Sequence, residues 1–192
     1  MSFRAARILT VLTLVAVPAL ATSVADARHP STLRAVATQQ CADANLHPTA
    51  GNLKRIRRAI LCLHNKVRAQ NDLSPLRENR RLRRAARAHS RDMTAAGYFE
   101  HTAPDGTTMV QRILRADYAR DDQGWMLGEN LAWGTGSLGT PRGAMKAWMA
   151  SPGHRANILK AGFRELGVGV VARVPSSDAA GATYTVDFGV RR

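Results

Sequence analysis

The sequence predicts one α+β domain, with helices in the first half of the chain and a small sheet in the second. Apolar residues recur at three- and four-residue steps between residues 53 and 96, which is the period of an amphipathic helix. Near the C-terminus, the strand-like segments 168–174 and 183–190 flank a loop and predict a closing antiparallel hairpin. The 192 residues, 45% hydrophobic and 22% charged, suit a packed domain and exclude a largely disordered chain.

The first 27 residues have the features of a secretory signal peptide. Arg4 and Arg7 precede an apolar run over residues 8–21, which is short for a membrane span. Residues 25–27, Ala-Asp-Ala, supply a small-x-small cleavage site. We therefore expect cleavage after Ala27 and a secreted protein that is extracellular or associated with the cell wall. The alternative is an uncleaved membrane anchor.

Two cysteines, Cys41 and Cys62, are interpreted together with this leader. Export would place the chain where disulfides form, and an even pair in a secreted chain is most simply one bridge. Cys62 lies beside the apolar stripe of a predicted helix, where it can accept a segment laid across that helix. Cys41 lies in such a polar segment. Two separate free thiols are the alternative.

The first elements of the exported chain are a tether and two long helices. Residues 28–52 are expected to form an N-terminal tether with little core of its own. The first helix is predicted over residues 53–70. The second is predicted over residues 80–96, with Asn79 as its N-cap and Gly97 as its stop. On the inner faces of these helices, His64 and His89 are expected to be packing residues.

Shorter elements follow in the second half of the chain. A short helix is predicted after Thr107-Thr108, a polar loop over residues 119–128 and a strand over residues 130–135. Two further helices open where a cap residue precedes a proline, at Thr140-Pro141 and at Ser151-Pro152. Ser151 is therefore expected to act as an N-cap.

The outer face of the second helix is strongly basic. It carries Arg80, Arg81, Arg83, Arg84, Arg87 and Arg91. The whole chain has a formal net charge of +14, with 24 arginines and four lysines, a bias that is typical of GC-rich coding. The simplest interpretation is a solvated face. The functional one is nonspecific attachment to an anionic cell-wall or membrane surface. Because no nucleic-acid-binding motif is found, we expect no sequence-specific nucleic acid binding.

Five stretches carry a resemblance to a known family. They are LHNKVR (63–68), YFEHTAPDG (98–106), GENLAWG (128–134), AWMASPGHRANIL (147–159) and FRELGVGV (163–170). In this order they resemble the CAP superfamily of cysteine-rich secretory, antigen 5 and pathogenesis-related proteins, especially the bacterial secreted SCP-domain type. The resemblance assigns residues 53–192 to a CAP/SCP domain. It implies a three-layer α-β-α sandwich with a small antiparallel sheet.

The resemblance also implies a binding cleft lined by His101, Glu129, His154 and Ser151. Ser151 stands where members of the family have a second acid. The two imidazoles of His101 and His154 suit a metal such as zinc, with Glu129 as a ligand or an orienting partner. Because two protein ligands make a weak site, a bound zinc ion would be exchangeable. The alternative is a polar cleft that holds loops in place and binds no metal.

These residues favour a secreted, non-catalytic binding module over an enzyme. The second acid is missing, and no G-x-S-x-G motif supports a triad of Ser151, His154 and Glu129. The expected ligand is a small molecule, a lipid or a peptide, with or without a divalent ion. The alternative is a metal-dependent extracellular hydrolase that acts on peptide or cell-wall material, with Glu129 as the candidate catalytic residue.

Overall fold

The computed structural model describes residues 34–36, 38, 40–120, 124–175 and 177–191, so the expected signal peptide lies outside the described residues. The helices are α2 (Leu53–Ala69), α3 (Arg80–Ala96), α4 (Met109–Arg115), α5 (Pro141–Ala150) and α6 (Pro152–Ile158), with a 3-10 turn η1 (Gly136–Gly139). The strands are β1 (Arg77–Glu78), β2 (Trp125–Thr135), β3 (Glu165–Val171) and β4 (Gly181–Arg191). Within the described ranges, no helix is long and apolar enough to cross a membrane.

The four strands form one sheet in the order β1-β3-β4-β2. Strands β3 and β4 pair antiparallel, which confirms the predicted closing hairpin, and β4 also pairs antiparallel with β2. Strand β1 is a two-residue addition that pairs parallel with β3 at one edge. Strand β2 begins at Trp125, so the prediction of a loop through residue 128 was wrong. Its first residues are held in the sheet by pairing with the end of β4, where Trp125 lies opposite Arg191.

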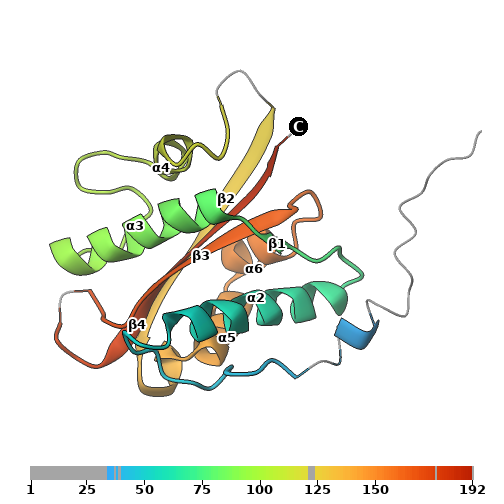
Figure 1. Ribbon diagram of the computed structural model, residues 1–192, viewed down its shortest axis with the longest axis horizontal. Helices are drawn as coiled ribbons and strands as arrows, with labels where there is room; N and C mark the ends of the chain where they lie inside the picture. The colour runs from blue at the N-terminus through green and yellow to red at the C-terminus, as the bar shows by residue number, and fades with distance from the viewer. Residues whose placement is uncertain (1–33, 37, 39, 121–123, 176, 192) are drawn as a thin grey trace, which may run out of the picture.

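Helices cover both faces of this sheet and give the α-β-α layers of the fold (Figure 1). Helices α2, α5 and α6 pack on one face, where they bury the alternate residues Leu166, Val168 and Val170 of β3. Helices α3 and α4 pack on the other face, with Leu82 and Ile113 in a second, smaller cluster. The α+β sandwich predicted for the chain is confirmed.

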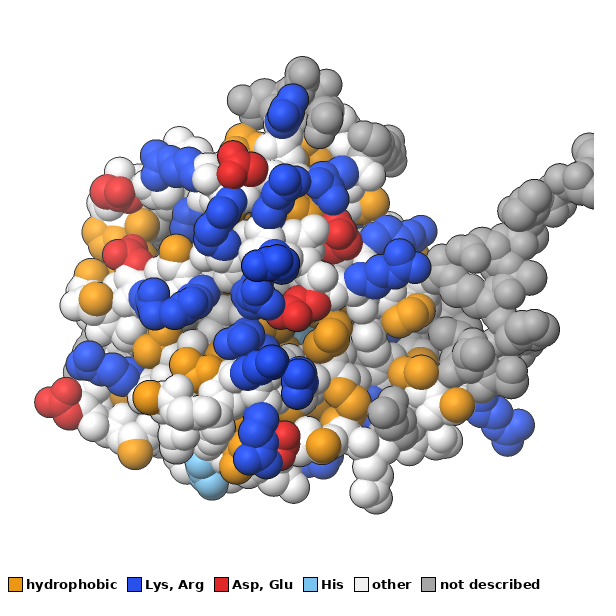
Figure 2. Space-filling view, viewed as in Figure 1, with side chains coloured by type: hydrophobic (Ala, Val, Ile, Leu, Met, Phe, Trp, Pro, Cys, Tyr) orange, Lys and Arg blue, Asp and Glu red, His pale blue; other side chains and the backbone are white. Residues whose placement is uncertain are grey.

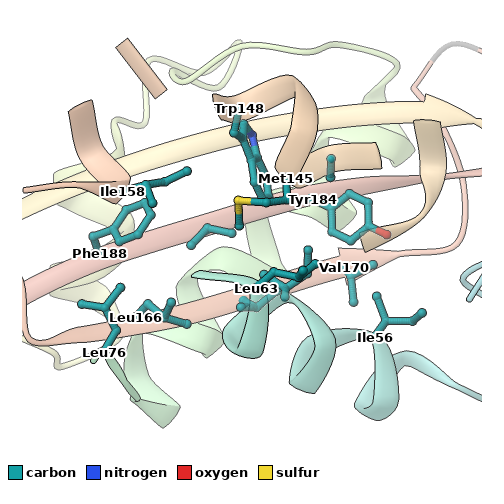
Figure 3. Packing of buried hydrophobic residues seen from close by; sticks show 14 of the residues in the cluster. Ile56, Leu63, Leu76, Met145, Trp148, Ile158, Leu166, Val170, Tyr184 and Phe188 are labelled. Atoms are coloured by element: carbon teal, nitrogen blue, oxygen red, sulfur yellow. The ribbon is translucent and has the colours of Figure 1, made fainter. Parts of the chain in front are cut away.

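The larger core combines aliphatic and aromatic side chains (Figure 3). Trp148 of α5 is 1% exposed, and its indole N–H donates to the carbonyl oxygen of Leu131 at 2.8 Å. Phe163 stacks on Phe188 with 5.4 Å between the ring centroids. His64 is fully buried against Trp148 and Phe188, and its Nδ1 lies 2.8 Å from the carbonyl oxygen of Ile60. It is the packing residue that the sequence predicted.

Helix α3 lies directly against β3 because two glycines leave room for it. A Cβ atom at Gly167 would overlap the backbone of Leu82 and Arg83, and one at Gly169 would overlap the backbone carbonyl of Ala86. Since a helix backbone cannot bend aside locally, glycine is required at both positions. This contact fixes α3 along the strand.

Caps set the ends of most helices where the sequence placed them. The Asn79 side chain accepts from the amides of Arg81 and Leu82, and Gly97 ends α3 in the left-handed conformation with φ of 71°. Thr140 caps α5 by accepting from the amide of Gly143. Ser151 occupies the N-cap position of α6, but its hydroxyl makes no cap hydrogen bond. The prediction that Ser151 caps this helix was wrong.

The segment expected to be a tether lies against the domain at its C-terminal end. Cys41 and Cys62 form the predicted disulfide, with Cα atoms 5.7 Å apart. Ala44 is buried in the larger core, and its carbonyl oxygen accepts from the Arg142 amide at 2.8 Å. Arg142 Nε also donates to Asn45 Oδ1 at 2.7 Å. The disulfide therefore fastens to α2 a segment that also contacts α5.

We expect the double substitution Cys41→Ser and Cys62→Ser to lower the free energy of unfolding by about 3 kcal/mol, because opening this loop restores chain entropy to the unfolded state. The two cysteines are separated by 21 positions. Thermal melts of wild type and variant, each with and without reductant, measure the loss. Reductant should lower only the wild-type melting temperature. An unchanged melting temperature in the variant would contradict the prediction.

Candidate functional site

The carboxylate of Glu129 is the centre of the candidate site. Glu129 lies on β2 and is 5% exposed. Its Oε1 lies 2.8 Å from Nδ1 of His101, and its Oε2 accepts from Nη2 of Arg112 at 2.8 Å. Burial opposes ionisation, but the hydrogen bond with His101 and the charge of Arg112 outweigh it and lower the pKa of Glu129. An ionised carboxylate only accepts, so His101 donates through Nδ1.

This hydrogen bond decides which nitrogen of His101 is available. With Nδ1 committed to Glu129, Nε2 is the ring atom left for a ligand. The His101 side chain is 58% exposed, and the hydrogen bond to Glu129 raises its pKa. The residue before it, Glu100, is held through its carbonyl oxygen, which accepts from Nε2 of buried His89 at 2.9 Å. His89 is thus the expected packing residue, and it also fixes the segment that presents His101.

Arg112 is a site residue that sequence reasoning missed. It lies on α4, its side chain is 9% exposed, and its Nη1 donates to the carbonyl oxygen of Thr107 at 3.1 Å. Helix α4 begins with a capping box formed by Thr108 and Gln111, which sets the helix register and so the direction of Arg112. Nothing in the sequence distinguishes Arg112 from the other arginines, because its partner lies 17 positions away on a strand.

His154 comes to the site from α6. Its backbone carbonyl oxygen accepts from Asn130 Nδ2 at 3.0 Å, and Asn157 Nδ2 donates to Asn130 Oδ1 at 2.9 Å. These amides tie α6 to β2 beside Glu129. The ring of His154 is half-buried and makes no hydrogen bond to the described residues. Burial, followed by the charge of His101, lowers the pKa of His154.

Ser151 takes no part in this network. Its hydroxyl makes no hydrogen bond to His154, Glu129 or any other residue in the described part of the chain. A Ser-His-Glu relay is therefore not assembled. Within the same residues, no group of three or more His, Cys, Asp and Glu side chains is arranged to hold a metal ion. Glu129 orients the ring of His101 through the hydrogen bond to Nδ1.

Asp187 is a second acid at the site that sequence reasoning also missed. It lies on β4 directly opposite Glu129 in the sheet register, is fully buried, and neither carboxyl oxygen has a hydrogen-bond partner among the described residues. Burial and the charge of Glu129 raise the pKa of Asp187 well above its ordinary value. Of the two acids, Glu129 is ionised and Asp187 is neutral. An acid within a strand of alternating apolar residues was the signal that could have found it.

A sheet covered by helices on both faces, with Glu129 of β2 hydrogen-bonded to His101 of the loop after α3, defines an α-β-α sandwich of the CAP class. The profile of the Cysteine-rich secretory protein family matches residues 61–188. The chain belongs to this family.

Relatives of known sequence and structure agree with this assignment. The uncharacterized Bacillus subtilis protein YkwD is 36% identical over 112 residues, which are 58% of this chain and 41% of YkwD. An extracellular SCP-domain protein from Bacillus anthracis superposes with a TM-score of 0.60 at 30% identity, over 76% of this chain and 44% of that one. An outer surface protein from Borrelia burgdorferi shares the fold, with a TM-score of 0.58 at 21% identity over 76% of this chain and 96% of that protein. The chain spans less than half the length of the curated relatives it matches.

We expect Asp187→Asn to raise the free energy of unfolding at pH 7 by about 1 kcal/mol, or roughly 3 °C in melting temperature. The raised pKa means that the folded chain holds this proton more tightly than the unfolded chain. The contribution of Asp187 to the free energy of unfolding is therefore fully present below the ordinary aspartate pKa of about 4. It is lost as the pH rises through the pKa that Asp187 has in the folded chain. Asparagine mimics the neutral acid and removes this loss.

Melts of wild type and Asp187→Asn from pH 4 to pH 8 would test this, since the curves should meet at the acid end and diverge with rising pH. Asp178→Asn is the matched control, because Asp178 is fully exposed in a loop. A variant less stable than wild type at every pH would show that the Asp187 carboxylate is needed in its ionised form.

Proposed function

We propose that this chain is an extracellular binding module whose cleft, formed by His101, Glu129 and His154, takes a small molecule, a lipid or a peptide. The observation that carries the proposal is that the Glu129 carboxylate is fully hydrogen-bonded within the protein. Both of its oxygens are held within the protein, by His101 and Arg112, while ring nitrogens of the two histidines stay open. A carboxylate whose pKa is lowered by such partners is a poor general base, which favours binding over hydrolysis.

Three observations support an extracellular location. The first 27 residues have the pattern of a signal peptide. The domain contains a disulfide, which is typical of exported proteins. Two of its structural neighbours are described as an extracellular protein and an outer surface protein. Together these support export of the domain to a surface or medium where its ligand is met.

We also propose that the cleft binds a zinc ion reversibly. His101 Nε2 and the ring of His154 would hold the ion, and water would complete its coordination, because Glu129 is already committed to orienting His101. Bound there, the ion would offer a positive charge to an anionic group of the ligand. Two protein ligands make such a site weak and exchangeable.

Calorimetric titration of the exported chain with zinc should show reversible binding at pH 7.5. His101→Ala and His154→Ala should each weaken it by roughly tenfold or more, because each removes one of two ligands. Binding should also weaken as the pH falls below neutral, first through protonation of His101, whose pKa is raised by the hydrogen bond to Glu129. His47→Ala is the matched control, since His47 is an exposed histidine outside the site. Equal zinc affinity in all three variants would contradict the zinc site.

Glu129→Gln separates a binding module from a hydrolase. Ligands retained from the host would first be identified by mass spectrometry, and their binding to wild type and variant then compared. We expect ligand binding to remain measurable in the variant, although weaker because His101 and Arg112 lose the carboxylate that holds them, with no turnover of peptide or cell-wall substrates by either protein. The contrary outcome is metal-dependent turnover by wild type that Glu129→Gln abolishes, which would establish the hydrolase.

A further inference from the structure

We propose that the outer faces of α2 and α3 form a second binding site, for a linear polymer of phosphodiesters. We name this surface the basic groove. It consists of Lys54, Arg57 and Arg58 on α2 and of Arg80, Arg81, Arg83, Arg84, Arg87 and Arg91 on α3. Figure 2 shows Lys and Arg side chains gathered across the middle of this face. The proposal is independent of the histidine cleft.

The groove is made of two hollows that share one lining residue. One has a volume of about 720 Å³ and is lined by the six arginines of α3 with Ala88 and Asp117. The other, of about 130 Å³, lies between the helices over Val168 of β3, and Arg83 lines both. The pKa of Arg57 on α2 is lowered by partial burial and by the charges of Arg83 and Arg87 on α3. Charges of the two helices therefore act on one another.

Most of these cations lack a carboxylate partner among the residues that the structure describes. Glu78 pairs with Arg83 at 2.9 Å, and Asp117 pairs with Arg84 at 3.0 Å. The other seven members of the basic groove make no ion pair with the described residues. A solvated face that serves only solubility mixes charges of both signs. Unpaired cations around a hollow instead focus a positive potential that an external anion can neutralise.

The cations of the groove can hold phosphate, and its dimensions point to a chain. Eight of the nine are arginine, a share close to the 24 of 28 in the whole chain, and the planar fork of each can bind two oxygens of one phosphate. From Arg80 to Arg91 the row extends about 16 Å along α3. A single anion cannot engage a row of this length, whereas a linear polymer with one charge per repeat can.

The shape and lining of the groove favour a phosphodiester polymer over a membrane surface and over single-stranded nucleic acid. A bilayer surface is too broad to enter a hollow between helices. The large apolar side chains that are exposed in the described structure, Trp133 and Leu138, line neither hollow and so do not provide a membrane anchor there. No aromatic side chain lines the groove either, and stacking on aromatic rings is the usual basis of single-stranded nucleic acid binding.

The test uses the exported chain and a fluorescently labelled poly(glycerol phosphate), with binding followed by anisotropy from low to physiological salt. The double variant Arg57→Gln/Arg87→Gln removes one cation from each helix, and neither makes an ion pair with the described residues. At low salt it should bind the polymer roughly tenfold more weakly. The slope of the logarithm of its binding constant against the logarithm of the salt concentration should be smaller in magnitude by about 1.4. The matched control is Lys146→Gln/Lys160→Gln, which loses the same charge outside the groove and should bind like wild type.

Equal loss in the lysine control would overturn the proposal, because net charge and not the groove would then govern binding. Tighter binding of an oligo-dT of equal phosphate number would assign the groove to nucleic acid. Binding to anionic phospholipid vesicles that depends on Arg57 and Arg87, without polymer binding, would assign it to a membrane. If the double variant melts below wild type, Arg87→Gln alone serves, since Arg87 is exposed, and its slope should fall by about 0.7.

Discussion

A buried negative charge in the sheet organises the site. Glu129 is ionised at 5% exposure, which is tolerated only while His101 and Arg112 hold its two oxygens. Breaking a buried pair by removing one partner typically costs about 3–5 kcal/mol. The docking of α4, which carries Arg112, and the position of His101 both depend on this carboxylate. Asp187, directly across the strand pair, accordingly remains neutral.

The carboxylate also connects chain segments that lie far apart in the sequence. Its backbone carbonyl oxygen accepts from Asn157 of α6, while its side chain accepts from α4 and from the loop after α3. Asn130, the next residue, holds α6 through the carbonyl oxygen of His154. Two consecutive residues of β2 therefore set the positions of both histidines. The arrangement of these side chains is thus set by hydrogen bonds to the strand.

Local signals in the sequence were sufficient for the helices and for the hairpin. Asn79 and Gly97 mark the ends of α3 because caps act on adjacent amides and carbonyls. Local signals in the sequence did not predict which residues form the site. His101, Glu129 and His154 are separated by 28 and 25 positions, and only the family resemblance grouped them.

The family resemblance did not identify two members of the site. Arg112 and Asp187 belong to it through helix register and strand register, which the sequence does not display. Ser151 illustrates the opposite error, because a correct helix start did not ensure that the hydroxyl would reach a free amide.

Helix α3 links the cleft to the basic groove. Its inner face fixes the approach to His101 through His89, and Ser90 donates to Thr185 Oγ1 of β4 at 2.8 Å. Its outer face carries six arginines whose mutual repulsion opposes the compact arrangement. The helix remains in place because Gly167 and Gly169 admit its backbone onto β3, where no small shift is possible without a clash. The same close contact that positions the histidine loop therefore also fixes the helix backbone from which the six arginines project.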